Sequence, residues 1–304
     1  MNRDRDALAD YTDAAMKSSA VVLHAYSTSF GLASRLFEAS VRRQVESVYA
    51  LVRVADEIVD GVSSAAGLDA EETRRQLDEF ERETERALAI GYSANLVVHA
   101  FADTARRTGI GTELTQPFFA SMRADLDRVE HTPESFEEYV YGSAEVVGLM
   151  CLKCFLHGRD VTPDERARLE RGARHLGAAF QKVNFLRDLA EDFESLGRSY
   201  FPDVSPANFD EEHKLLLLKD IDHDLDESRR VLRGLPPSSR RAVALAQELF
   251  AELADRIRDT PAAELMTTRI SVPNTVKMRI ALAVLAGKRG MSAAEDRETG
   301  AEAR

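Results

Sequence analysis

VESVYALVRVADEIVDG, residues 45–61, has the pattern of a helix that is apolar around most of its circumference. At roughly 100° per residue, its polar side chains fall within about 100° of arc. A helix on a protein surface shows the reverse, a limited apolar stripe and a broad polar face. The pattern predicts a helix over 41–60 that packs on most sides and turns one polar strip toward an interior space. The strip consists of Tyr49, Arg53, Asp56, Glu57 and Asp60.

The two aspartates of this strip, Asp56 and Asp60, are four residues apart. At that spacing they share a helix face, where like charges repel by about a few tenths of a kcal/mol. If the face is buried, the cost is far larger unless a cation compensates for it. We therefore expect something positive to lie against this face.

A second stretch, RHLGAAFQKVNFLRDLAEDF at 174–193, repeats the pattern. One glycine and four polar residues recur at spacings of four, three, four and four, which again defines one helix face. Apolar residues fill most of the other positions, and Arg187 adjoins the first of two aspartates. This second strip consists of Gly177, Gln181, Asn184, Asp188 and Asp192.

Two such strips favour a shared site, although one Asp-x-x-x-Asp spacing alone is common in acidic helices. Four carboxylates and an amide form an oxygen-rich set that suits Mg²⁺. This ion usually takes one or two carboxylates plus phosphate oxygens, and the nearby arginines suit a diphosphate. The alternative that stays open is a buried network of structural ion pairs.

The rest of the chain predicts one all-α domain. Helical periodicity is clear at 69–90, 211–233 and 238–259. The breaks between helical stretches are short or contain aromatic residues and proline, so none resembles a linker between domains. We expect a single domain over 1–290 and a disordered tail over 291–304.

Composition and charge exclude several classes of function. The 304 residues are 44% hydrophobic and 30% charged, as in globular proteins. A formal net charge of −12 argues against nucleic acid as a partner and against electrostatic attachment to a membrane. No run of eighteen apolar residues and no signal peptide is evident, so we expect a cytoplasmic protein.

The two cysteines, Cys151 and Cys154, form a C-x-x-C pair with His157 three residues further on. Redox and metal sites use this spacing, but no βαβ pattern surrounds the pair and no second ligand pair follows. The apolar neighbours favour small core residues instead.

Taken with three further motifs, the two strips resemble the squalene/phytoene synthase family over roughly residues 20–290. YALVRVADEIVD is similar to the family's first aspartate-rich motif and FQKVNFLRDLAEDF to its second. YSTSF (26–30) resembles a serine-rich segment that holds a diphosphate, GRSYFP (197–202) an Arg-x-Tyr element, and RISVPNTVK (269–277) a basic segment. The resemblance implies an isoprenoid synthase-type helical bundle around a central cavity, with the aspartates on facing helices.

The resemblance also implies roles, residue by residue. Mg²⁺, with Mn²⁺ as an alternative ion, would be held by Asp56, Asp60, Asn184, Asp188 and Asp192. The diphosphates would be contacted by Tyr26, Ser27, Thr28, Ser29, Tyr49, Arg53, Gln181, Arg187, Arg198, Tyr200 and Arg269, with Lys277 in the same basic segment. The residues expected to be catalytic are Asp56, Asp60, Asp188, Asp192, Arg53 and Tyr139, the last of which would line the cavity.

The chain departs from the family in the segment EYVYGSAEVVG, residues 138–148. Relatives usually read Val-Ala-Gly-x-Val-Gly, whereas here Glu145 places a carboxylate on an apolar helix. It would either pair with a nearby arginine, reshape the pocket for the prenyl tail, or be an ordinary polar group of helix packing. The position before the serines, often histidine in relatives, is Tyr26.

The implied reaction joins two allylic prenyl diphosphates head to head. Diphosphate leaves the first molecule, and the double bond of the second attacks the resulting cation to give a cyclopropylcarbinyl diphosphate. A second ionisation, a rearrangement and loss of a proton yield the hydrocarbon. GSAEVVGLMCL resembles bacterial phytoene synthases more than squalene-forming relatives, which favours geranylgeranyl diphosphate as substrate, phytoene as product, and no NADPH.

Two alternatives stay open and a third is excluded. A squalene, dehydrosqualene or presqualene diphosphate synthase would use farnesyl diphosphate. A non-catalytic relative would act as an assembly partner for other prenyl enzymes, although its helices would not be expected to keep all of these polar residues. An oxygen-using di-iron bundle is excluded, because no glutamate lies three residues before any of the seven histidines.

The hydrophobic product bears on the expected partners. A prenyl hydrocarbon must reach a membrane, which predicts a transient peripheral contact, yet no basic amphipathic helix is evident in the sequence. Prenyl diphosphates are the expected small-molecule partners, and the sequence does not indicate an oligomeric state.

Overall fold

The all-α architecture predicted from the sequence is confirmed. A computed structural model describes residues 2–127, 130–191, 200–205 and 207–288, and no β-strand occurs in these ranges. The tail predicted to be disordered lies outside them. The elements are α1 (Asn2–Tyr26), α2 (Thr28–Ser34), α3 (Ala39–Val59), α4 (Val62–Ala65), α5 (Ala70–Ile90), α6 (Leu96–Thr108), α7 (Thr112–Asp127), α8 (Pro133–Val140), the π-helix η1 (Tyr141–Glu145), α9 (Val146–Leu156), α10 (Pro163–Glu191), α11 (Glu211–Val231), the 3₁₀-helix η3 (Leu232–Gly234), α12 (Pro237–Asp259), α13 (Ala262–Leu265) and α14 (Asn274–Leu285).

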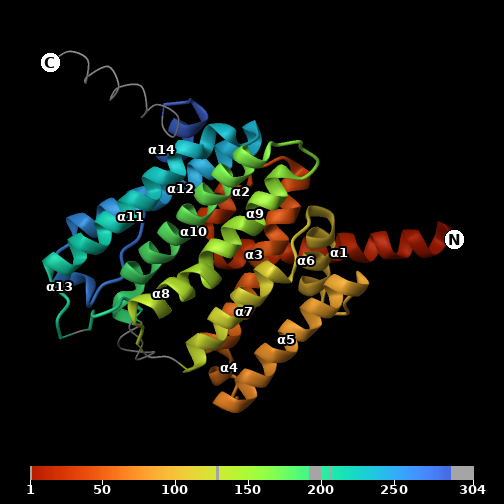
Figure 1. Cartoon of the computed structure of the whole chain (residues 1–304), viewed down its shortest axis with the longest axis horizontal. Helices are drawn as coiled ribbons and strands as arrows, with labels where there is room; N and C mark the ends of the chain where they lie inside the picture. The colour runs from red at the N-terminus through yellow and green to blue at the C-terminus, as the bar shows by residue number, and fades with distance from the viewer. Residues whose placement is uncertain (1, 128–129, 192–199, 206, 289–304) are drawn as a thin grey trace.

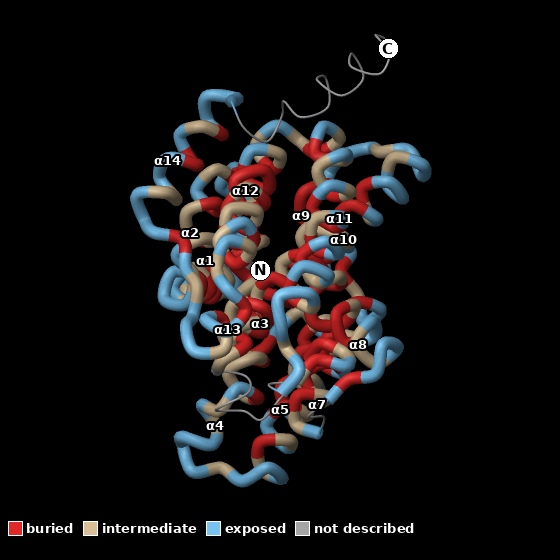
Figure 2. The backbone as a smooth tube through the Cα atoms, turned by 90° about the vertical axis from the view of Figure 1, so that its left-hand side faces the viewer, coloured by how far each residue is buried: buried red, intermediate tan, exposed pale blue. Residues whose placement is uncertain are grey.

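The two helices that carry the polar strips are α3 and α10, and both are surrounded by others. α3 packs against α1, α5, α6, α7 and α9, whereas α10 packs against α9, η1, α11 and α12. Figure 1 shows α10 and α11 running side by side. Because α9 contacts both α3 and α10, it holds the two strip-bearing helices within one bundle. Figure 2 shows the buried residues concentrated in the middle of the molecule.

Local sequence explains where the helices begin and end. The side chain of Asp69 accepts a hydrogen bond from the backbone N–H of Glu72 and caps the start of α5. The same helix ends at Gly91, whose left-handed backbone suits glycine. Thr132 caps α8 through a reciprocal capping box with Ser135.

The interior of α3 bears out the prediction that this helix packs on most sides. Val48, Leu51 and Ala55 have no exposed surface, and they lie in one apolar cluster with side chains of α5, α6, α7 and α9. At about 25 cal/mol per Å² of buried apolar surface, such a cluster is the main source of stability for these helices. The polar strip of α3 is therefore fixed in orientation by the packing of the remaining faces.

Two glycines allow the backbones around η1 to come unusually close. A Cβ on Gly142 would lie 2.3 Å from the carbonyl oxygen of Pro117 in α7. A Cβ on Gly177 would lie 2.5 Å from the carbonyl oxygen of Ala144, which brings α10 against η1. The π-helix of Tyr141–Glu145 is thus clamped between α7 and α10.

One helical stretch, Pro133–Leu156, is long and apolar enough by composition to cross a membrane. Of its most apolar 18-residue window, 56% is buried inside the protein, and the stretch packs against α3, α7 and α10. Its apolar character is accounted for by this packing.

The cysteines of α9 are core residues, as expected from their neighbours. Cys154 is buried and Cys151 partly so, and both are free thiols. Burial raises the pKa of Cys151 to about 12 and that of Cys154 well above its usual value. Since the thiolate is the reactive form, neither sulfur is prepared for redox or metal chemistry.

Candidate active site

The last turn of α3 brings together the acidic residues of the first strip. Asp56 is half-buried on the helix, and Asp60 is its C-cap, with a backbone N–H that donates to the Asp56 carbonyl at 2.8 Å. Burial and the charge of Asp60 raise the pKa of Asp56 well above its ordinary value, although Arg53 opposes the shift. The two carboxylates therefore repel each other across one turn of the helix.

Arg53 connects this acidic end to the junction of α1 and α2. Its guanidinium forms an ion pair with Glu57 and lies 4.5 Å from the ring centroid of Tyr26. Its Nε is buried and has no hydrogen-bond partner. Tyr49 lies one turn earlier on α3, and its phenol is beside the hydroxyl of Ser27, the N-cap of α2.

The second strip ends in a group of cations around one carboxylate. Asp188 accepts hydrogen bonds from Nε of Arg187 at 2.9 Å and from Nε of Arg269 at 2.7 Å. Lys277 of α14 donates to the Thr28 hydroxyl of α2 at 2.8 Å. Burial and the nearby charge of Arg187 lower the pKa of Lys277. Two arginines thus share the Asp188 carboxylate, and a lysine lies close to one of them.

One turn before Asp188 on the same helix lies Asn184, whose amide oxygen is unsatisfied. Its Oδ1 is buried and accepts no hydrogen bond. A buried amide oxygen left without a donor costs about 1–3 kcal/mol, so a native protein rarely keeps one without reason. Gln181 lies on the same face of α10 and is half-buried, and Ser29 is half-buried in the first turn of α2.

Two residues of the predicted site, Asp192 and Arg198, lie outside the described residues. Their roles stay predictions. Most of the remaining predicted residues lie on α3 or its C-cap, on α10, or where α1 ends and α2 begins. The others are Tyr139 on α8, and Tyr200 and Arg269 in segments between helices.

Sequence reasoning missed one carboxylate of this region, Asp125 on α7. It is 8% exposed and accepts hydrogen bonds from the phenols of Tyr139 at 2.9 Å and Tyr200 at 3.1 Å. Its charge also contributes to the raised pKa of Asp56, so the carboxylate is close to the end of α3. A signal was present in the sequence: Asp125 shares a helix face with Phe118, which is fully buried.

Asp125 joins the two strips through the tyrosines that it holds. The ring of Tyr200 stacks on Phe185 of α10 with centroids 4.1 Å apart, and Tyr139 lies 6.0 Å from the same ring. Burial and the charge of Asp125 raise the pKa of Tyr139 well above its usual value, so its phenol stays protonated and donates. α7, α8 and α10 are thereby tied together beside the acidic end of α3.

Aromatic rings also bridge the helices deeper in the bundle. Phe30 of α2 lies 6.1 Å from Tyr49 of α3, 5.7 Å from Phe180 of α10 and 5.9 Å from Phe250 of α12. Phe180 and Phe250 stack with centroids 3.9 Å apart. These rings link α2, α3, α10 and α12 in one aromatic cluster beside the two polar strips.

The pockets found on this structure do not test whether a central cavity lies between the two strips. One of these pockets opens beside the site and is lined by Tyr26, Arg53 and Glu57 together with apolar residues of α1 and α4.

Comparison of the sequence with models of protein families explains why these residues occur together. A model of the squalene/phytoene synthase family matches residues 23–276, which is most of the chain. The chain belongs to this family. Members of the family are head-to-head prenyl transferases that act on prenyl diphosphates.

Relatives of known function in the squalene/phytoene synthase family share about 30% of their residues with this chain. Phytoene synthase 3 of Zea mays is 30% identical over 247 residues, 78% of this chain and 53% of the maize protein. The 15-cis-phytoene synthase of Synechocystis is 30% identical over 255 residues, 76% and 73% of the two chains. The alignment thus spans about half of the maize protein and about three-quarters of the cyanobacterial one.

Solved structures of the family share the fold. A dehydrosqualene synthase bound to a ligand superposes with a TM-score of 0.76 at 22% identity, over 91% of this chain and 97% of that one. A squalene synthase from Alicyclobacillus acidocaldarius gives a TM-score of 0.68 at 20% identity, over 82% and 94%. Both likenesses confirm the isoprenoid synthase-type bundle.

The residues described here fit the Mg²⁺ site that the squalene/phytoene synthase resemblance implies. Among the described residues, no three His, Cys, Asp or Glu side chains are grouped so that they could hold a metal by themselves. Mg²⁺ does not require such a cage, since it commonly keeps waters and bridges to substrate phosphate. The repulsion between Asp56 and Asp60 and the orphaned Asn184 oxygen are both relieved by a cation.

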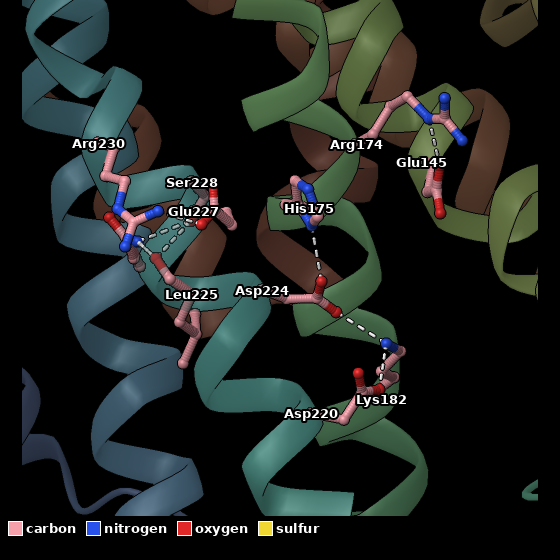
Figure 3. A network of polar contacts seen from close by, with 11 residues as sticks. Glu145, Arg174, His175, Lys182, Asp220, Asp224, Leu225, Glu227, Ser228 and Arg230 are labelled. Atoms are coloured by element: carbon pink, nitrogen blue, oxygen red, sulfur yellow. Dashed lines mark hydrogen bonds and ion pairs between the residues drawn. The ribbon is translucent and has the colours of Figure 1, made fainter. Parts of the chain in front are cut away.

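Glu145 forms an ion pair, which was one of the outcomes open from the sequence. Its Oε2 accepts from Nε of Arg174 at 2.5 Å, and the Arg174 guanidinium lies 5.2 Å from the ring centroid of Tyr141 (Figure 3). Arg174 is exposed, so the pair lies at the surface between η1 and α10. The carboxylate is compensated there.

Proposed function

We propose that this protein is a phytoene synthase that joins two molecules of geranylgeranyl diphosphate head to head, in a Mg²⁺-dependent reaction without NADPH. The observation that carries the proposal is the division of charge at one end of the bundle. Asp56 and Asp60 repel each other at the end of α3, and Arg187 and Arg269 gather on Asp188 of α10. The start of α2 contacts residues beside both groups through Ser27 and Thr28. A diphosphate with metal ions would add a cation beside the carboxylates and an anion beside the arginines.

The chain's own residues would bind and orient the leaving group. Arg187, Arg269 and Lys277 are placed to bind diphosphate oxygens once the substrate competes with Asp188 for the two arginines. Thr28, which accepts from Lys277, would hold that ammonium toward the site. Arg53, with its unpartnered Nε, would contact a second phosphate group.

Mg²⁺, held by Asp56, Asp60, Asn184, Asp188 and Asp192, would supply the Lewis acidity that draws the diphosphate away from the allylic carbon. Mn²⁺ is an alternative ion for the same oxygen ligands.

The aromatic residues would protect the carbocations that follow. The C1–O bond of one substrate breaks with its electron pair on the diphosphate, and the 2,3-double bond of the other attacks C1 and loses a proton. The second diphosphate then leaves, and rearrangement and loss of another proton give the hydrocarbon. Phe30, Phe180 and Tyr49 would face the cations with their electron-rich rings and exclude water.

A second candidate is a synthase of thirty-carbon products from farnesyl diphosphate. The solved structures most similar in fold include a dehydrosqualene synthase and a squalene synthase, and their likeness supports the shared reaction type without fixing chain length. The phytoene synthases among the sequence relatives support the longer substrate.

A product assay distinguishes the candidates. The purified full chain is incubated with geranylgeranyl or farnesyl diphosphate and Mg²⁺, with and without NADPH, and the extracted hydrocarbons are identified. Phytoene from the longer substrate without NADPH is the expected result. A thirty-carbon product from farnesyl diphosphate would replace the substrate but keep the mechanism.

No hydrocarbon from either substrate would instead indicate a non-catalytic relative. A thermal shift then distinguishes an empty scaffold from a binding protein, because a ligand that binds only the folded state raises its Tm. We expect inorganic diphosphate with Mg²⁺ to raise Tm more than either alone. The cytoplasmic location predicted from the sequence stays a prediction.

A further inference from the structure

The C-terminal helix α14 is apolar on its exposed face as well as on its buried face. Met278, Leu282 and Leu285 recur at spacings of four and three and are 52%, 62% and 52% exposed. The opposite face packs into the bundle through Ile280 and Val284. Large apolar side chains exposed together on one helix face mark a surface that is covered in the working state of a protein.

Charge near α14 has the opposite sign to that of the chain. Between residues 265 and 294 there are five lysines and arginines and no aspartate or glutamate, although the whole chain has a formal net charge of −12. The net charge of the whole chain therefore does not reveal this positively charged segment. The described members of this set are Arg269, Lys277, Arg279 and Lys288.

The beginning of α14 lies beside the candidate active site. Lys277 in its first turn donates to Thr28 of α2, and its pKa is lowered by the neighbouring Arg187 of α10. The exposed apolar side chains continue along the helix from that point. A surface that covers them would therefore lie close to the place where prenyl diphosphates are expected to bind.

We propose that the exposed face of α14, formed by Met278, Leu282 and Leu285 and flanked by Arg279 and Lys288, docks on an anionic lipid membrane. Anionic headgroups complement the basic flanks, and each basic residue near such a surface adds attraction. The leucines and the methionine enter the boundary between headgroups and acyl chains, as in helices that lie in the membrane plane. The sequence alone did not indicate this helix because an amphipathic pattern was sought, and α14 has none.

The docked orientation would deliver long-chain substrates from the lipid phase to the site. This consequence rests on the proposed function, but binding to the membrane does not. A vesicle assay therefore tests the docking surface whatever the substrate proves to be.

The decisive experiment is flotation of the full-length protein with vesicles of phosphatidylcholine, with and without about 30 mol% phosphatidylglycerol. We expect binding to the anionic vesicles and its loss as salt screens the charges over a Debye length of about 8–10 Å. Leu282→Glu should lower the partition coefficient by about tenfold or more, because it removes apolar contact and adds a repelled charge. Its fold is checked by circular dichroism.

The chain offers a matched control in Leu216→Glu. Leu216 is 66% exposed on α11, which Figure 2 shows across the molecule from α14, whereas Leu282 is 62% exposed. The control should bind vesicles as the unmodified protein does. Arg279→Gln tests the charge contribution and should weaken binding to anionic vesicles only.

Three results would overturn the proposal. The unmodified protein would fail to float with anionic vesicles, or Leu282→Glu would bind as well as Leu216→Glu. In the third, light scattering would show a dimer that Leu282→Glu dissociates, and the face would then be covered by a second copy of the chain.

Discussion

The two sides of α10 carry polar clusters of opposite character. On the side toward α11, Asp224 accepts from Nδ1 of His175 at 2.7 Å and from Lys182 at 2.8 Å, and Lys182 also binds Asp220 (Figure 3). Each of these side chains has a hydrogen-bond or ion-pair partner within the cluster. On the other side, Asn184 has an oxygen without a donor, and Asp188 faces two arginines.

This difference separates a structural network from a binding site. Buried charges that are paired within the protein need nothing further, so the cluster of His175, Lys182, Asp220 and Asp224 fastens α11 to α10. Charges and amides left unmatched are tolerated where a ligand completes them. Sequence spacing alone does not distinguish these cases, since both clusters contain aspartates on an apolar helix.

The largest effect on turnover is expected from a substitution at Asp56. Asp56→Asn should lower kcat by about 10²–10³-fold or more, because it removes a ligand charge for the Mg²⁺ that would stabilise the leaving diphosphate. The fold should be retained, since Asp56 contributes repulsion rather than pairing in the ligand-free protein. Product formation and circular dichroism measure the two effects, and normal turnover in this variant would contradict the assigned role.

Asp125 tests whether the tyrosines must be held for catalysis. Asp125→Asn keeps the shape but weakens two hydrogen bonds, each worth about 1.5–3 kcal/mol when the acceptor is charged. We expect kcat to fall by about ten- to a hundredfold while KM changes little, by loss of an oriented group. If Tyr139→Phe and Tyr200→Phe leave kcat unchanged, Asp125 is only structural.

Asp224 tests the structural cluster on the α11 side of α10, where we expect a loss of stability and not of activity. Asp224→Asn should lower the free energy of unfolding by about 1–3 kcal/mol, because Lys182 is 13% exposed and loses a charged partner. Turnover should be nearly unchanged. Urea unfolding is the measurement, with Asp226→Asn as control, since Asp226 is 57% exposed on the same helix. Loss of activity without loss of stability would contradict the distinction drawn between the two clusters.

In the ligand-free protein, the raised pKa of Asp56 predicts how stability depends on pH. Asp56 has a folded-state pKa above its unfolded value, so the folded state holds the proton more tightly. Its contribution is zero well below the ordinary pKa and becomes destabilising as pH rises through the raised value. In EDTA, Asp56→Asn should therefore raise Tm relative to the unmodified protein more at pH 7 than at pH 4. A difference independent of pH would contradict this.

The smallest effect is expected at Glu145. Its partner Arg174 is 51% exposed, and pairs of this kind contribute about 0.2–1 kcal/mol. Glu145→Gln should leave both the product chain length and the turnover unchanged. A shift between thirty- and forty-carbon products would show that the residue shapes the tail pocket.

Much of the candidate site was predictable because periodicity carries orientation. The strips on α3 and α10 were predicted from spacing alone, and burial of Val48, Leu51 and Ala55 confirms that α3 packs on its other faces. Asp125 could not be assigned in the same way. A single acid on an apolar helix face has no spacing partner, and the tyrosines it binds are 14 and 75 residues away in the chain.

The sequence by itself determined the helices, the two polar strips and the family, because these depend on residues within a few turns of one another. Tertiary structure decided which polar groups are compensated: Glu145 by Arg174, Asp224 by Lys182 and His175, and Asn184 by nothing in the described protein. It also decided that Met278, Leu282 and Leu285 remain exposed beside the site. Compensation and exposure are properties of contacts between distant segments, and spacing along one helix does not contain them.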